Sequence, residues 1–206
     1  GIFTSDYDIG NFKASLNFIT LLSALAIPIA TSLFPAFSKF DEKGKKVKTF
    51  FGLSLKYGSL IMVPSALLII ILSKELIQIV YEASFASASI YLALHATLFL
   101  TIGLGYQIQK SFFSGLGETK QTLKVSLIQF VFFVFLAPCL AMVMGVTGLI
   151  ASILTSNIIA TVYGAYCAKS RYKVEFNYKT LLRIYLLALA SACLLYTSDA
   201  ADEEDS

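Results

Sequence analysis

The sequence predicts an all-α integral membrane protein with five complete transmembrane helices and a truncated sixth. The first observation is composition: 57% of the 206 residues are hydrophobic and only 14% are charged, and the mean hydropathy is +0.75. Soluble globular chains are about 45–50% apolar and about a quarter charged. Charge this sparse cannot cover a surface that faces water, so the composition excludes a soluble enzyme, a soluble binding module and a disordered chain.

The second observation is the length of the charge-free stretches. A charged side chain is costly at the bilayer centre, and a helix needs about 20 residues to cross the hydrocarbon. Between Lys124 and Lys169 lie 44 uncharged residues, which would form a single helix of about 66 Å. The sequence Met-Gly-Val-Thr-Gly at 144–148 is a good tight turn, so it divides this stretch into two spans.

The predicted spans are therefore 14–38, 57–74, 86–109, 125–143 and 147–168. A sixth begins near Leu181 and runs out by Tyr196. Helices fit these long, uniformly apolar runs, whereas barrel strands alternate over about ten residues. A helix also satisfies its own backbone hydrogen bonds in lipid.

The basic residues sort to one side of these spans. Segments 39–56, 110–124 and 169–183 hold fourteen of the sixteen lysines and arginines. Cytoplasmic loops carry such an excess, so the three segments are predicted to be cytoplasmic and residue 1 to lie outside. Beyond this topological role the lysines would attract anionic lipid weakly. Nothing offers the basic face with stacking or groove-reading elements that nucleic-acid binding needs.

The two ends of the sequence predict a fragment. The chain begins with Gly1 on the predicted outer side, directly before a span, and we interpret residues 1–195 as an incomplete C-terminal transmembrane bundle of a larger protein. Segment 196–206 holds five of the thirteen acidic residues. We interpret it as a non-native tail, and the alternative is a genuine acidic extracellular tail.

Several local patterns follow one another along the chain. They are Gly10–Asn17 before the first span, Leu33-Phe-Pro-Ala-Phe-Ser-Lys39 at its end, a lysine-rich loop, a span with Pro64, Ile79–Ala88, Gly115-Leu-Gly-Glu-Thr-Lys120, and Met144–Ala151. This series resembles the lipid-linked oligosaccharide flippases of the polysaccharide-export family, in the multidrug/oligosaccharidyl-lipid/polysaccharide superfamily. The chain departs from the family pattern at Lys39 and Glu118, where arginines are usual. The resemblance covers about residues 1–195.

The resemblance implies a fold and an activity. The family fold has two pseudo-symmetric bundles around a central cavity, and the present spans would be its helices eight to thirteen. The implied function is to flip a lipid-linked oligosaccharide, a polysaccharide precursor, across the cytoplasmic membrane by alternating access. The implied partners are the lipid-linked glycan, the bilayer and the missing N-terminal bundle of the same chain. No catalytic residue, metal or other cofactor is expected, because nucleotide-binding loops and intramembrane carboxylate pairs are absent from the sequence.

Three other functions remain open on the sequence. A cation-coupled multidrug extruder would place a coupling carboxylate in the membrane, and none occurs in the predicted spans. A membrane-embedded glycan polymerase or ligase would need a long external loop with charged catalytic residues, but the external connections at 75–85 and 144–148 are short. A purely structural membrane subunit shares every compositional feature, and only the ordered motifs argue against it.

The first span holds the main candidates for the substrate cavity. Asn17, Thr20 and Ser23 recur every three residues, which favours one helical face. Lys13 could meet a phosphate, or it could simply snorkel to the outer interface. The resemblance implies that this helix borders the cavity. The candidates in this span are Asn11, Lys13, Asn17, Thr20 and Ser23.

Other candidates lie deeper in the chain. His95, the single histidine, is either a proton-sensitive group or a neutral residue that bonds a neighbouring helix. Asn157, with Gln107, Gln109 and Gln129, either lines the cavity or forms hydrogen bonds between helices. The prolines predicted to bend helices, actively or as static kinks, are Pro28, Pro64 and Pro138. The three cysteines are read as packing residues rather than a disulfide framework.

The topology can be tested with inserted tags. A tag within 41–48 should be inaccessible to antibody outside intact cells, and a tag at Gly145 should be accessible, because the basic segments face the cytosol. The opposite pattern of accessibility would overturn the orientation and weaken the family resemblance that agrees with it.

Overall fold

The computed structural model describes residues 5–40, 44–81 and 85–204, with side chains as far as Leu194. Lys43 of the predicted cytoplasmic loop lies outside the described residues. Seven helices are present in these ranges and no strand is found there. They are α1 (Asp6–Phe37), α2 (Lys45–Ile71), α3 (Ser73–Val80), α4 (Ala86–Gly103), α5 (Tyr106–Gly115), α6 (Thr119–Tyr172) and α7 (Tyr178–Glu204). The all-helical prediction is confirmed.

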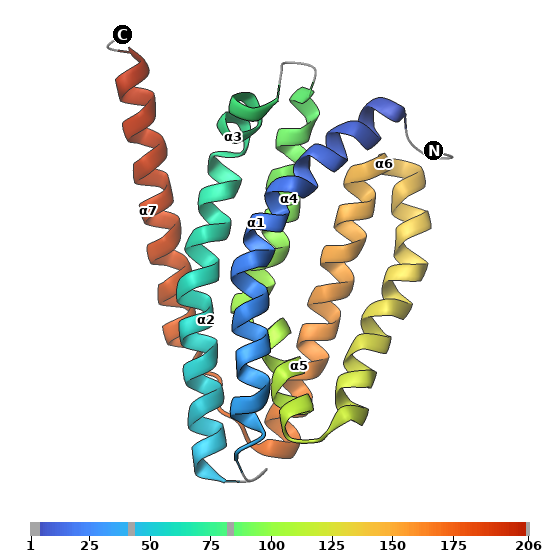
Figure 1. Ribbon diagram of the computed structural model, residues 1–206, viewed down its shortest axis with the longest axis vertical. Coiled ribbons are helices and arrows are strands. Elements are labelled where there is room, and N and C mark those ends of the chain that lie inside the picture. The colour runs from blue at the N-terminus through green and yellow to red at the C-terminus, as the bar shows by residue number, and fades with distance from the viewer. Residues whose placement is uncertain (1–4, 41–43, 82–84, 205–206) are drawn as a thin grey trace.

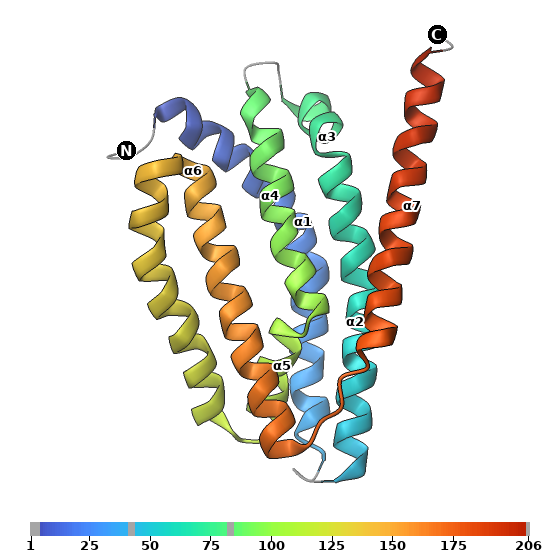
Figure 2. The same cartoon turned by 180° about the vertical axis from the view of Figure 1, so that it is seen from behind.

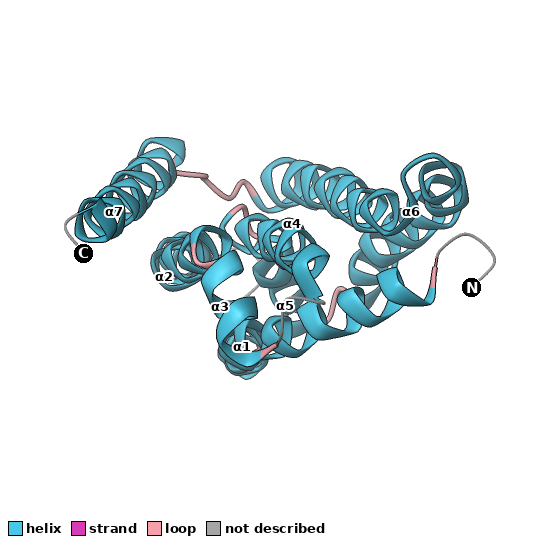
Figure 3. Cartoon of the chain, turned by 90° about the horizontal axis from the view of Figure 1, so that it is seen from above, coloured by secondary structure: helices cyan, strands magenta, loops and turns pink. Residues whose placement is uncertain are grey.

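Four of these helices are long and apolar enough to cross a membrane, namely α1, α2, α4 and α6. The long helices run side by side along the long axis of the molecule (Figure 1; Figure 2). Helix α4 packs against α1, α2 and α6, and α7 packs against α2. Seen from above, α7 lies at one edge and α6 at the other (Figure 3).

Helix α6 reverses direction in its middle and forms two antiparallel arms (Figure 1). The reversal is at Gly145, whose φ of 59° and ψ of −132° are not helical. Gly148 follows, and a Cβ there would overlap the carbonyl of Leu140. The turn lies inside the predicted 144–148 connection, so the division of this stretch into two spans agrees with the structure.

Several element boundaries differ from those predicted. Helix α2 begins at Lys45 rather than near 57, and the predicted segment 110–124 is mostly helical, with α5 and α6 separated only by residues 116–118. The physical reason is that lysine continues a helix readily and its long side chain reaches water from a helical backbone. The positions of the charged residues therefore did not predict the helix ends. Helix α3 (Ser73–Val80) covers the predicted end of the span 57–74 and the first half of the predicted loop 75–85.

Helix α7 also differs from its prediction. The apolar run ends by Tyr196, but the helix continues to Glu204. Alanine and glutamate, which are frequent in this segment, have high helix propensity, so the backbone can remain helical after the apolar run has ended.

The single helix predicted for 86–109 is wrong, because the chain breaks at Leu104 and Gly105. Gly105 has a φ of 103°, a left-handed conformation that glycine adopts without steric cost. The Leu104 N–H donates to Thr101 O at 3.1 Å instead of continuing the helical pattern. The sequence Gly103-Leu-Gly105 thus ends α4, and α5 begins one residue later.

Side chains from two other helices satisfy the carbonyls that this break releases. Ser59 of α2 donates its hydroxyl hydrogen to Gly103 O at 2.9 Å, and the Tyr185 hydroxyl of α7 donates to Leu100 O. Without water in the hydrocarbon, each unpaired backbone group would cost several kcal/mol. The break is therefore stable only where α2 and α7 pack against it.

An aromatic cluster joins the helices below the break. The ring of Phe112 in α5 lies 5.3 Å from Phe37 of α1, 4.9 Å from Phe51 of α2 and 5.2 Å from Tyr172 of α6, in edge-to-face arrangements. Phe37, Phe51 and Phe112 are fully buried. Such pairs contribute about 0.5–1.5 kcal/mol each beyond area burial. Helix α5 therefore stabilises the packing of α1, α2 and α6 at this end of the bundle.

Gly105→Ala should destabilise the fold more than its matched control Gly117→Ala. Both glycines have positive φ, but a Cβ at Gly105 would lie 2.8 Å from Leu55 Cδ2, whereas Gly117 has open space around it. The backbone strain of about 1–2 kcal/mol is common to both, and overpacking adds about 1 kcal/mol or more at Gly105. Thermal unfolding in detergent measures the difference, and equal midpoints for the two variants would contradict it.

Candidate functional site

Helix α1 has one buried face that is mainly apolar and one exposed face that carries polar residues. Phe18, Leu22 and Ala26 are buried in the core. The other face exposes Lys13, Asn17, Thr20, Ala24, Pro28 and Thr31. We call these six residues, of which Lys13, Asn17, Thr20 and Thr31 are polar, the α1 polar stripe. Three of the predicted cavity residues, Lys13, Asn17 and Thr20, lie on it, and Ser23 is half-buried beside it.

The hydrogen bonds of the stripe determine what it offers a ligand. Asn17 Nδ2 donates to the Tyr81 hydroxyl at 2.7 Å. The hydroxyls of Thr20 and Ser23 donate to Leu16 O and Ile19 O of their own helix, each at 3.0 Å. Their hydrogens are therefore used internally, and the oxygens remain as acceptors. Together with the ammonium of Lys13, this face can bind hydroxyl groups and an anion.

Asn11 is on the opposite side of α1 and is buried. Its Nδ2 donates to Tyr7 O at 2.9 Å, and its Oδ1 accepts from the Ala88 N–H at 2.9 Å. The second bond satisfies a backbone donor in the first turn of α4, as a helix cap does. The structure thus gives Asn11 a role in joining α1 to α4.

His95 is buried in α4. Its ring centre lies 5.2 Å from that of Phe12 in α1. Its Nδ1 has no hydrogen-bond partner within the described parts of the chain. His95 therefore lies between α1 and α4 and not on the polar stripe, and neither of its predicted roles is tested by this placement.

Asn157 belongs to a hydrogen-bonded network between α5 and the two arms of α6. Asn157 Oδ1 accepts from Gln129 Nε2 at 2.5 Å, and Gln129 Oε1 accepts from the Tyr106 hydroxyl. Lys110 Nζ donates to the Tyr106 hydroxyl at 2.7 Å and to Gln129 Oε1 at 3.3 Å. We call Tyr106, Lys110, Gln129 and Asn157 the α5–α6 network.

The sequence did not identify Lys110 as a site residue, because it was counted among the lysines of a cytoplasmic loop. The available signal was the spacing of Tyr106 and Lys110, which are four residues apart and would share one face of a helix. Gln109, between them, is fully buried, and neither its Oε1 nor its Nε2 is hydrogen-bonded in the part of the chain that the structure describes.

The three predicted bend residues lie inside continuous helices. Pro28 is in α1, Pro64 in α2 and Pro138 in the first arm of α6. The break in the bundle occurs instead at Gly105. The role of the prolines in a conformational change therefore stays a prediction.

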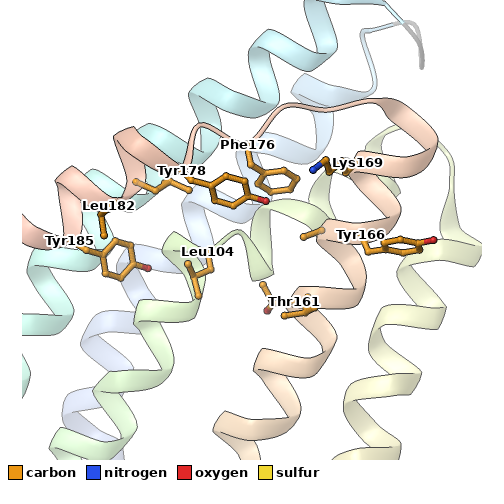
Figure 4. Close-up of a pocket in the computed structure, with 11 residues that line it drawn as sticks. Leu104, Thr161, Tyr166, Lys169, Phe176, Tyr178, Leu182 and Tyr185 are labelled. Carbon is orange, nitrogen blue, oxygen red and sulfur yellow. The ribbon is translucent and has the colours of Figure 1, made fainter.

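An apolar pocket opens between the second arm of α6, α7 and the connection between α4 and α5. Its volume is about 680 Å³, within the range of small-molecule sites. Figure 4 shows Tyr185 pointing from α7 toward the helix that carries Leu104, and Lys169 near Phe176 at the other end. The lining is almost entirely apolar and includes Leu104, Val162, Ala165, Leu181 and Leu182. Such a pocket suits a hydrocarbon chain.

Fold and site together define a class, a bundle of helices apolar enough to span a membrane with a polar face along one of them. The family model described as lipid II flippase MurJ matches residues 13–203. The chain belongs to this family. No curated protein matches the chain.

A solved structure, "Lipid II flippase MurJ, inward closed conformation", has the same fold. It superimposes with a TM-score of 0.81 at 20% sequence identity and covers 93% of this chain. The match covers 41% of that protein, so the chain spans less than half of its length.

The family assignment corrects one expectation and supports others. The chain belongs to a family of lipid-linked precursor flippases, as the resemblance implied, but the family is MurJ and not the polysaccharide-export family. MurJ proteins are multi-pass proteins of the cell membrane, and flippases are transporters rather than enzymes. The matched family is one of flippases and not of multidrug extruders or glycan polymerases.

The two asparagines of α1 should respond differently to substitution. Asn11→Ala should lower the free energy of unfolding by about 1 kcal/mol, because it leaves a helix N-terminal donor unsatisfied. Asn17→Ala, whose bond to Tyr81 is exposed, should change stability by less than about 0.5 kcal/mol. Thermal unfolding of both variants tests this, and a larger loss at Asn17 than at Asn11 would refute it.

Proposed function

We propose that the protein of which this chain is a part flips a lipid-linked oligosaccharide precursor across the cell membrane, with the α1 polar stripe as part of the path of the headgroup. The structural relative is named for lipid II, and a precursor of that kind is the proposed substrate. Such a molecule combines a long hydrocarbon tail with a polar, anionic headgroup. The protein needs to break no bond and must only carry the headgroup past the hydrocarbon.

The α1 polar stripe is the observation that carries this proposal. Lys13, Asn17, Thr20 and Thr31 are exposed along one face of α1. Polar groups exposed to lipid are unfavourable, and in membrane proteins they face a bundle interior or a hydrated cavity. A second bundle opposite α1, supplied by the part of the transporter that this chain does not span, would complete such a cavity. Rocking of one bundle against the other would expose it alternately to each side.

The apolar pocket beside α7 suits the tail of the same substrate. Its lining is nearly free of polar surface, and it adjoins helices that are apolar enough to span the membrane. A tail held there would remain in a hydrocarbon environment while the headgroup moves. Separate surfaces for tail and headgroup match the amphipathic chemistry of the substrate.

A reconstitution experiment tests the proposal. Full-length protein containing this chain should move a fluorescent lipid-linked sugar across vesicle membranes, and residues 1–195 alone should not, because one wall of the cavity would be missing. In the full-length protein, Asn17→Leu combined with Thr20→Val should slow transport roughly tenfold, the effect of losing about 1–2 kcal/mol of polar contacts.

The control is Leu25→Val, an exposed apolar exchange on the same helix, which should leave the rate unchanged. Unchanged transport in the double variant would exclude the stripe from the path. Fast transport by residues 1–195 alone would show that a second bundle is not needed.

A further inference from the structure

Lys110 is a positively charged side chain held inside the bundle by neutral groups. Its Nζ donates to the Tyr106 hydroxyl at 2.7 Å and to Gln129 Oε1 at 3.3 Å, and it lies 4.3 Å from the centre of the Tyr106 ring. These contacts orient the ammonium but do not neutralise it. A partly buried charge is costly unless it is paired, so the arrangement favours the approach of an anion.

The orientation of this lysine is fixed by residues on three segments. Gln129 on the first arm of α6 accepts from both Tyr106 and Lys110, while its Nε2 donates to Asn157 on the second arm at 2.5 Å. Asn157 thereby holds the amide so that its oxygen faces the lysine. The two hydrogen bonds of Lys110 use two of the three donors of an ammonium, which leaves one for a ligand.

Helix α5, which carries Lys110, packs against α1. The next residue, Ser111, donates its hydroxyl hydrogen to Ala30 O of α1 at 2.8 Å. The segment of α5 that carries the lysine therefore packs against the same helix as the polar stripe, in its predicted cytosolic half. Lys39, Lys45 and Lys46 at this end of the molecule are exposed, whereas Lys110 is partly buried and therefore less screened by solvent.

We propose that Lys110 binds the diphosphate of the lipid-linked substrate on the cytosolic side of the bundle, with Tyr106, Gln129 and Asn157 as positioning residues. The assignment rests on the proposed flippase function. Phosphate oxygens are strong acceptors for an ammonium, and charge-assisted hydrogen bonds are about twice as strong as neutral ones. The same chemistry occurs in anionic phospholipids, so the test must separate the two sources of phosphate.

The experiment measures lipid binding to the full-length protein in detergent. The probes are a fluorescent prenyl-diphosphate-linked sugar, the same sugar joined to the prenyl chain by a neutral ether, and phosphatidylglycerol as competitor. Lys110→Gln should weaken binding of the diphosphate probe roughly tenfold and leave the ether probe unchanged. Lys110→Arg should bind the diphosphate probe within about threefold of the parent protein, because it keeps the charge.

The matched control is Lys45→Gln, which removes an exposed lysine from the same end of the molecule and should alter neither probe. Tyr106→Phe removes the hydroxyl that orients the ammonium and should weaken the diphosphate probe about threefold while sparing the ether probe. This variant keeps the lysine and serves as the second test if Lys110→Gln does not fold.

Specific outcomes would overturn the assignment. Equal loss of both probes in Lys110→Gln would make the lysine a structural residue, and effective competition by phosphatidylglycerol would make its ligand the bulk phospholipid. If the parent protein transports the lipid-linked sugar and Lys110→Gln binds and transports like it, this assignment alone fails. If the parent protein transports no lipid-linked sugar, the proposed function itself fails.

Discussion

The need to satisfy every backbone polar group without water constrains this bundle most strongly at the break between α4 and α5. Uninterrupted helices meet this need within themselves, but Gly105 interrupts the pattern inside a run predicted to span the membrane. Ser59 and Tyr185 supply the replacement donors from α2 and α7. The break at Gly105 therefore depends on the contacts that α2 and α7 make with the end of α4.

Small residues let the helices approach closely enough for these bonds to form. A Cβ on Gly103 would lie 2.5 Å from the Tyr185 hydroxyl, and one on Gly115 would lie 2.6 Å from Phe37 Cβ. On α6, Gly164 leaves room for the buried amide of Gln109. Close contact at glycine and alanine is the usual way in which membrane helices pack, since lipid gives no hydrophobic driving force between them. Glycine thus acts here through contacts as well as through conformation.

The sequence predicted what depends on composition and failed where distant residues decide. Charge-free runs predicted the helical class, and the three-residue recurrence of Asn17 and Thr20 predicted that they share one face of α1. They could not reveal the break, because Ser59 and Tyr185, which stabilise it, lie far from Gly105 in the sequence. The contacts of Lys110 were missed for a related reason: a lysine near the end of an apolar run has the same pattern whether it faces water or contacts Gln129. In the sequence Asn11 has the same pattern as the other polar residues of its span. Only its hydrogen bond with the Ala88 N–H shows that it joins α1 to α4.

The hydroxyl of Ser59 has one hydrogen but two carbonyl neighbours, Leu55 O of its own helix at 2.6 Å and Gly103 O across the interface at 2.9 Å. A serine in this position can turn its hydrogen toward either oxygen by rotation about its Cβ–Oγ bond. If α4 moves away from α2, the hydroxyl keeps Leu55 as an acceptor, and only Gly103 must find another donor. Separation of α2 and α4 therefore leaves one carbonyl without a donor, while the Ser59 hydroxyl stays hydrogen-bonded. Such an interface is less costly to separate than one in which the donor and the acceptor have no partner except each other.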